Sequence, residues 1–191
     1  MADKLSGKKV AILVADGFEE VEMTQPRKAL EEAGAGIDLI SPNPDRVRSW
    51  RFTEWGEYFD VDTALDQANP DDYDALHLPG GVINPDKLRI IPEAVEFVKA
   101  FFRAGKPVAA ICHGPWTLID AEVVEGRTVT SWPSLHADLK NAGAKWVDQE
   151  VVVDGGLITS RNPDDIPAYN KKMIEEFAEG VHAQQQAAAH A

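Results

Sequence analysis

Residues 106–116 read KPVAAICHGPW, a short apolar run that ends at a cysteine, a histidine and a glycine. The run KPVAAI is typical of a buried β-strand, because a strand covered on both faces of a parallel sheet is apolar throughout. Pro115 is favoured at the first position of a helix. The stretch therefore predicts a strand that ends at Cys112 and a helix that begins at Pro115, with His113 in the sharp turn between them.

The rest of the chain repeats this alternation of short strands and helices. Further strands are expected at residues 8–14, 36–41, 127–132 and within 69–81, hairpins at residues 47–61 and around residues 154–156, and helices at residues 92–104, 115–123, 134–142 and 163–181. A helix is also expected after the first strand, with Pro26 near its first turn, where proline is tolerated. This order favours an α/β fold with a mainly parallel sheet. We expect one domain over residues 1–182 and a disordered tail over residues 183–191.

Composition limits the partners of the chain. It has 191 residues, a formal net charge of −13 and no cluster of basic residues, so we do not expect it to bind nucleic acid. No run of apolar residues is long enough to span a membrane, and the N-terminus lacks the features of a secretory signal. A single cysteine cannot form an internal disulfide. We therefore expect a cytoplasmic protein with a reduced thiol.

In a parallel sheet, ligands bind beyond the carboxyl ends of the strands. This rule selects three loops, which are DGFEE at residues 16–20, PGG at residues 79–81 and CHG at residues 112–114. A lone cysteine is most often an inert, buried apolar residue. At the start of a helix, however, free N–H groups and the helix dipole stabilise a thiolate. Cys112 is therefore a candidate nucleophile, and its neighbour His113 is a candidate base that still needs an orienting acid.

Three glutamates follow the first strand, and each has two interpretations. Glu19, Glu20 and Glu22 all favour the start of a helix, and this is the simpler interpretation for Glu20 and Glu22. Glu19 lies directly past the strand end, so the sheet rule can bring it beside Cys112.

Taken in order, four segments resemble one family. They are VAILVADGFEEVE (10–22), ALHLPGG (75–81), GKPVAAICHGPWTLI (105–119) and TSWPSLHADLKNAGAKWVDQEVVVDGGLITSRNP (130–163). The chain resembles the PfpI family of the class I glutamine-amidotransferase-like superfamily. The resemblance implies a flavodoxin-like three-layer α/β sandwich that forms a homodimer or a higher homo-oligomer, and no cofactor or metal.

The resemblance also implies roles for particular residues. Cys112 would be the nucleophile, His113 its partner and Glu19 the carboxyl that shares a proton with the sulfur. The main-chain N–H groups of Gly81 and His113 would form an oxyanion hole. The acid that orients the histidine would come from a neighbouring subunit, and its position falls on Asp86, where the family usually has glutamate in a loop about one residue shorter.

Three reactions are open to such a thiol. The first, which we rank highest, is hydrolysis of glyoxal-type aldehydes or glycated adducts in a stress response. The second is peptide hydrolysis by an intracellular cysteine protease, and the third is oxidation of Cys112 in a redox sensor without turnover. The expected ligand is therefore a small molecule or a peptide.

Overall fold

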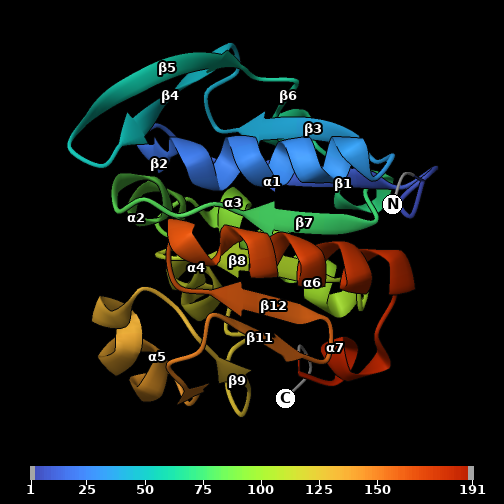
Figure 1. Cartoon of the computed structure of the whole chain (residues 1–191), viewed down its shortest axis with the longest axis vertical. Coiled ribbons are helices and arrows are strands. Elements are labelled where there is room, and N and C mark those ends of the chain that lie inside the picture. The colour runs from blue at the N-terminus through green and yellow to red at the C-terminus, as the bar shows by residue number, and fades with distance from the viewer. Residues whose placement is uncertain (1–2, 189–191) are drawn as a thin grey trace.

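The computed structural model describes residues 3–188, and its centre is a seven-stranded sheet (Figure 1). The strand order is β11-β12-β8-β7-β1-β3-β6. All neighbours are parallel except the edge strand β11, which pairs antiparallel with β12. The strands are β1 (Lys9–Leu13), β3 (Gly36–Ser41), β6 (Thr63–Ala64), β7 (Ala75–Leu78), β8 (Val108–Ile111), β11 (Val151–Asp154) and β12 (Leu157–Ser160).

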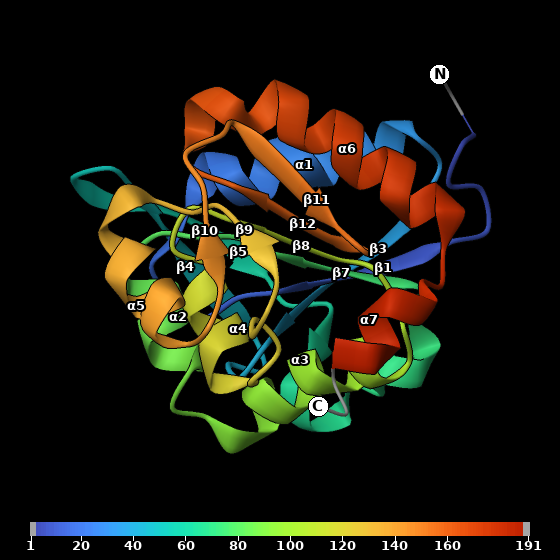
Figure 2. The same cartoon turned by 90° about the horizontal axis from the view of Figure 1, so that it is seen from below.

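Helices cover both faces of this sheet (Figure 2). One face carries α1 (Glu20–Glu32) and α6 (Ile166–Glu179), which pack against each other. The other face carries α2 (Ile83–Leu88), α3 (Pro92–Arg103), α4 (Pro115–Asp120), α5 (His136–Asn141) and α7 (Ala183–Ala188). This arrangement confirms the predicted flavodoxin-like three-layer sandwich with a mainly parallel sheet.

Alternate residues of β1 contribute to two separate parts of the core. Ala11 and Leu13 belong to the apolar cluster that includes Phe101 of α3, whereas Val10 packs in the cluster of α1 and α6. All three β1 residues are fully buried. Because successive side chains of a strand point to opposite faces, one apolar strand can join two helical layers.

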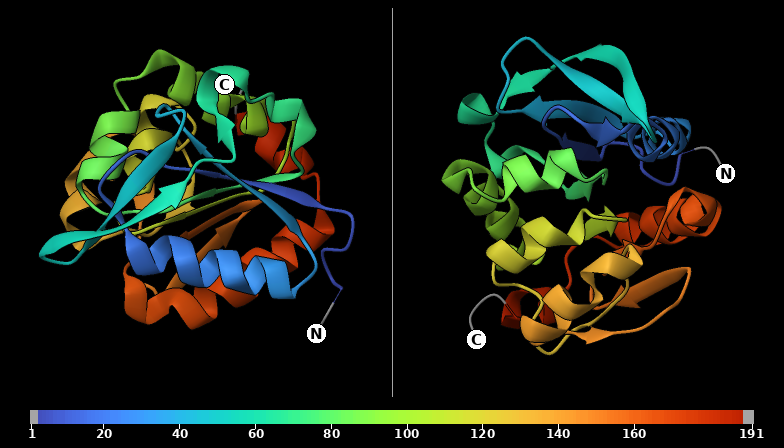
Figure 3. Two further views of the ribbon diagram at one scale, coloured as in Figure 1. Left: turned by 90° about the horizontal axis from the view of Figure 1, so that it is seen from above. Right: turned by 90° about the vertical axis from the view of Figure 1, so that its left-hand side faces the viewer.

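Two small sheets stand outside the central one. β2 (Phe18–Glu19), β4 (Arg46–Arg51) and β5 (Glu54–Asp60) form one, and β9 (Thr128–Val129) pairs with β10 (Lys145–Trp146) in the other. The predicted hairpin at residues 47–61 is confirmed as β4–β5, and it extends beyond the central sheet (Figure 3). Short 3₁₀ helices occur at Leu65–Gln67, Pro70–Asp72, Pro133–Leu135 and Pro163–Asp165.

Two expectations from the sequence need correction. Residues 183–188 were expected to be disordered, but they form α7, in which the fully buried Gln185 side chain donates to the carbonyl oxygens of Lys106 and Gly156. The rest of that expected tail, residues 189–191, lies outside the described residues. Pro26 was expected in the first turn of α1, but α1 begins at Glu20 and Pro26 lies in its interior.

Within residues 3–188, no helix is both long enough and apolar enough to cross a membrane.

Candidate active site

Cys112 occupies the turn between β8 and α4, with a backbone φ of +63°. This left-handed conformation costs a residue other than glycine about 1–2 kcal/mol. Two main-chain hydrogen bonds hold it in place: the Cys112 N–H donates to the Ser160 carbonyl at 3.0 Å, and the Trp132 N–H donates to the Cys112 carbonyl at 2.9 Å. The predicted turn between a strand and a helix is therefore present, and it places the thiol beyond the carboxyl end of β8.

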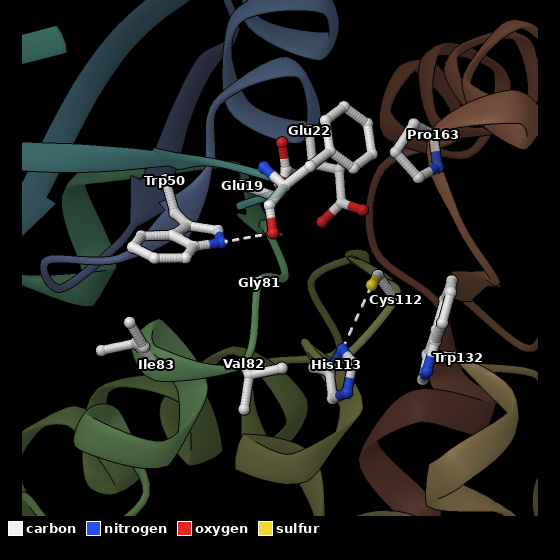
Figure 4. A pocket seen from close by; sticks show the side chains of 11 residues that line it. Glu19, Glu22, Trp50, Gly81, Val82, Ile83, Cys112, His113, Trp132 and Pro163 are labelled. Atoms are coloured by element: carbon white, nitrogen blue, oxygen red, sulfur yellow. Dashed lines mark hydrogen bonds between the residues drawn. The ribbon is translucent and has the colours of Figure 1, made fainter. Parts of the chain in front are cut away.

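His113 lies against the thiol and between two tryptophans. Its Nδ1 is 3.3 Å from the Cys112 Sγ, and its Nε2 is 3.5 Å from the Ser134 Oγ (Figure 4). The ring stacks on Trp132 and meets the edge of Trp116. Burial lowers the pKa of His113 to about 4, so the imidazole is neutral near neutral pH. A neutral ring at this distance accepts a proton from the thiol or donates one to the thiolate, depending on its tautomer.

Glu22, rather than Glu19, is the carboxyl whose pKa is coupled to that of Cys112. Its side chain is fully buried, and its Oε2 accepts a 2.8 Å bond from the Gly80 N–H. Glu19 lines the same cavity, but its Oε2 accepts from the main-chain N–H of Phe52 at 3.2 Å. The expected position of Glu19 is therefore wrong: α1 begins one residue after Glu19, and its first turn carries Glu22 on the buried face.

The sequence does contain a signal for Glu22. The buried positions of α1 include Glu22, Pro26 and Leu30, which repeat every four residues along one face. A glutamate in line with apolar residues at helical spacing has to be buried with them. The repeat predicts a buried carboxyl, which the simpler interpretation as a helix-start residue overlooks.

The Glu22 carbonyl is left free by Pro26 and is bonded by His77. Proline has no N–H, so Pro26 cannot donate to the carbonyl four residues before it, which is that of Glu22. The Nε2 of the fully buried His77 lies 2.8 Å from that carbonyl oxygen, and its Nδ1 lies 2.9 Å from the Tyr169 hydroxyl. Burial lowers the pKa of His77 to about 4, so it is a neutral donor at Nε2. The Glu22 carbonyl, which lacks its hydrogen bond within α1, thus receives one from His77 of β7.

Glu22 and Cys112 are buried titratable groups whose pKa values depend on each other. Burial raises the pKa of Glu22 to about 8, so near neutral pH the carboxyl keeps its proton and can donate it toward the sulfur. Burial and the charge of an ionised Glu22 raise the pKa of the Cys112 thiol, whereas main-chain hydrogen bonds from Gly81 and His113 lower it. The helix-end argument alone predicts an acidic thiol and neglects this burial. The two groups therefore titrate as a unit.

The two glycines after β7 fit closely around this pair. A Cβ on Gly80 would lie 2.5 Å from the Glu22 Oε2 and 2.7 Å from the Cys112 Cβ. Gly81 has a φ of +78°, and a Cβ there would lie 2.6 Å from the Gly17 carbonyl oxygen. Gly81 and Cys112 line the same cavity, and the role expected for the Gly81 N–H in an oxyanion hole stays a prediction.

The thiol opens into a cavity of about 330 Å³ (Figure 4). Its walls are mostly apolar and combine the hairpin β4–β5, the start of α2 and two loops near α5 and α6. The apolar lining residues are Trp50, Phe52, Val82, Ile83, Trp132 and Pro163.

Asp86 lies away from this group within one chain. It is an exposed residue of α2. Among residues 3–188, the hydrogen-bond partners of the His113 ring are Cys112 and Ser134, and neither is a carboxylate. The role expected for Asp86 requires a second subunit and stays a prediction.

Fold and site together define a class of α/β proteins with a cysteine at a strand–helix turn. The DJ-1/PfpI family model matches residues 8–176, and the chain belongs to the DJ-1/PfpI family. It is 42% identical to "Deglycase TK1284" of Thermococcus kodakarensis over 87% of this chain and 98% of that protein. It is 43% identical to "General stress protein 18" of Bacillus subtilis over 88% of this chain and 96% of that protein. The solved structure of Schizosaccharomyces pombe DJ-1 superposes with a TM-score of 0.79 at 27% identity, over 95% of this chain and 96% of that one.

Proposed function

We propose that the protein is a thiol-dependent hydrolase of glyoxal-type aldehydes or their adducts, acting in the cytoplasm in response to carbonyl stress. The observation that carries this proposal is the arrangement at Cys112, where the His113 Nδ1 lies 3.3 Å from the sulfur and the buried Glu22, whose pKa is coupled to that of the thiol, lines the same cavity. The name of the Thermococcus relative, a deglycase, supports the same class of reaction.

The groups present can carry out this chemistry on methylglyoxal. As the sulfur adds to the aldehyde carbon, the thiol proton passes to the His113 Nδ1, a C–S bond forms, and the carbonyl electron pair moves to oxygen, which takes a proton from Glu22; His113 then returns its proton to Glu22. The hydrogen on that carbon next leaves as a proton to neutral His113 and returns at the neighbouring carbon, while the proton of the new hydroxyl moves to the neighbouring oxygen, which produces a thioester. Water cleaves the thioester and restores the thiol, so the sum is methylglyoxal plus water giving lactate and one proton. No oxidant or metal is needed for this balance.

A second candidate is peptide hydrolysis, and the geometry within one chain favours it less. Cleavage of an amide needs a proton for the leaving amine, and a histidine that supplies it is normally oriented by a carboxylate. His113 has a pKa of about 4, and its ring contacts a hydroxyl rather than a carboxylate within the described chain. Aldehyde addition has no amine to expel, so it depends less on a charged histidine.

A third candidate is a redox sensor without turnover, and the buried Glu22 supports it. A carboxyl that keeps its proton near neutral pH can donate to a sulfinate oxygen and stabilise the oxidised sulfur.

One comparison separates the three candidates. Purified wild type, Cys112→Ser and a control, Glu57→Gln, are assayed for lactate formation from methylglyoxal and for cleavage of a fluorogenic peptide library. The proposal expects lactate from wild type and Glu57→Gln, and a loss of about 10²-fold or more in Cys112→Ser. Peptide cleavage without lactate would establish the peptidase, and neither activity, with Cys112 oxidised by dilute peroxide, would establish the sensor.

A further inference from the structure

Glu19 presents an unused hydrogen-bond acceptor at the cavity. Its side chain is 6% exposed and lines the cavity, and among residues 3–188 its Oε1 has no hydrogen-bond partner. Its position is fixed on both sides, because Glu19 pairs with Trp50 between β2 and β4 and its Oε2 accepts from the Phe52 N–H. A buried carboxylate oxygen without a donor is costly, so the site is suited to a ligand that brings one.

Near neutral pH burial keeps Glu22 protonated and His113 neutral, so Glu19 and Cys112 are the lining groups that can become charged, and both become anions. Burial raises the pKa of Glu19, and the hydrogen bond from the Phe52 N–H opposes this shift. Among the described residues that line the cavity, none is a lysine or an arginine. An anionic ligand would therefore lose its hydration without gaining an opposite charge.

The remaining walls suit a positive charge. Trp50, Phe52 and Trp132 line the cavity, and aromatic faces attract cations, tryptophan most strongly. A neutral or cationic ligand can therefore contact aromatic rings and Glu19 together.

We propose that Glu19 selects ligands by charge: the cavity takes neutral or cationic molecules that carry an N–H or O–H donor near their electrophilic atom, and it rejects anions. Glu19 is then a specificity-determining residue, distinct from the pair formed by Glu22 and Cys112. This inference deepens the proposed function, on which it rests for the use of this cavity by a substrate. Neutral, hydrated α-dicarbonyl compounds fit the selection, and α-keto acids such as glyoxylate do not.

The test measures how fast Cys112 reacts with two methanethiosulfonates of similar size, one with an aminoethyl group and one with a sulfonatoethyl group. In each reaction the thiolate attacks the sulfenyl sulfur, a disulfide forms and methanesulfinate leaves. Each rate is divided by the rate of the same reagent with 2-mercaptoethanol. High salt is used throughout, because it screens the field of the net charge of −13 more than interactions within the cavity.

Wild type should favour the cationic reagent by about tenfold or more, and Glu19→Gln should reduce this preference about fivefold or more. Glu57→Gln is the matched control: it removes the same charge from an exposed position of the hairpin and should leave the preference unchanged. Equal normalised rates in wild type, or the same preference in Glu19→Gln, would overturn the inference. The wild-type measurement needs no variant to fold, and neither measurement needs turnover. Loss of this preference and loss of methylglyoxal turnover are therefore separate outcomes.

Discussion

Replacing His77 by leucine should destabilise the protein through two buried groups that lose their partners. The Glu22 carbonyl and the Tyr169 hydroxyl each contact a nitrogen of the His77 ring, at 2.8 Å and 2.9 Å. His77 and Tyr169 are fully buried, so water cannot replace the lost bonds. Leaving a buried polar group without a partner costs about 1–3 kcal/mol, so His77→Leu should lower the free energy of unfolding by about 4 kcal/mol.

Part of this loss should be restored by a second substitution in a different element. In Pro26→Ala, the new N–H can donate to the Glu22 carbonyl within α1, which is the bond that proline prevents. The change also loosens the unfolded chain, but this effect is the same whether His77 or leucine is present. We expect Pro26→Ala to be more favourable in the His77→Leu background than in wild type by about 1–2 kcal/mol.

Urea unfolding of wild type, both single variants and the double variant gives this coupling energy. Tyr169→Phe serves as the control: it removes the other partner of His77, which Pro26→Ala cannot replace, so its coupling to Pro26→Ala should be near zero. If His77→Leu and Pro26→Ala are additive within about 0.5 kcal/mol, the carbonyl of Glu22 is not what connects them. If the bond also positions Glu22, the rate of Cys112 alkylation should be lower in His77→Leu than in wild type. It should be partly restored in the double variant, as stability is.

Three further predictions concern the residues around the thiol. Burial raises the pKa of Glu22 from 4.5 to about 8, so between these pH values the folded protein holds a proton that the unfolded chain has released. The free energy of unfolding of wild type should therefore fall as pH rises through this range, and Glu22→Gln should become more stable relative to wild type. The same pH dependence of both proteins in urea unfolding would contradict this. Gly80→Ala should destabilise the protein by about 1–3 kcal/mol and slow alkylation of Cys112, since its Cβ would lie 2.5 Å from the Glu22 Oε2; unchanged melting and alkylation would show that the turn can relax. If Asp86 completes the site across a subunit contact, mixing inactive Asp86→Asn with inactive Cys112→Ser should restore part of the lactate formation, and a monomer by light scattering would exclude it.

The fold could be predicted because it depends on patterns that a single chain displays. The apolar strands, the helix-starting Pro115 and the loop rule for parallel sheets place Cys112 and His113 correctly. The choice between Glu19 and Glu22 depends on where α1 begins: Glu19 belongs to β2, which precedes the helix, whereas Glu22 lies on the buried face of the helix itself. Local preference favours an acid at each of these positions, so it cannot decide between them.

The terminal helix α7 shows a second limit of reading the sequence. The segment AQQQ has no apolar face, yet Gln185 is buried by two hydrogen bonds to carbonyl groups from distant parts of the chain. Such bonds depend on main-chain groups left free elsewhere in the fold, and no side-chain pattern records them. The same is true of His77, whose partner exists because Pro26 lacks an N–H.

The cavity is assembled from parts that can change independently. Trp50 and Phe52 come from the hairpin β4–β5, whose strands pair with each other and with β2, whereas Cys112 is anchored to β12 of the central sheet. Exchange of residues 52–58 for another hairpin would therefore alter the shape of the entrance while the anchors of the thiol persist. Such a division makes the hairpin the natural place to redesign the shape of the cavity without moving the thiol.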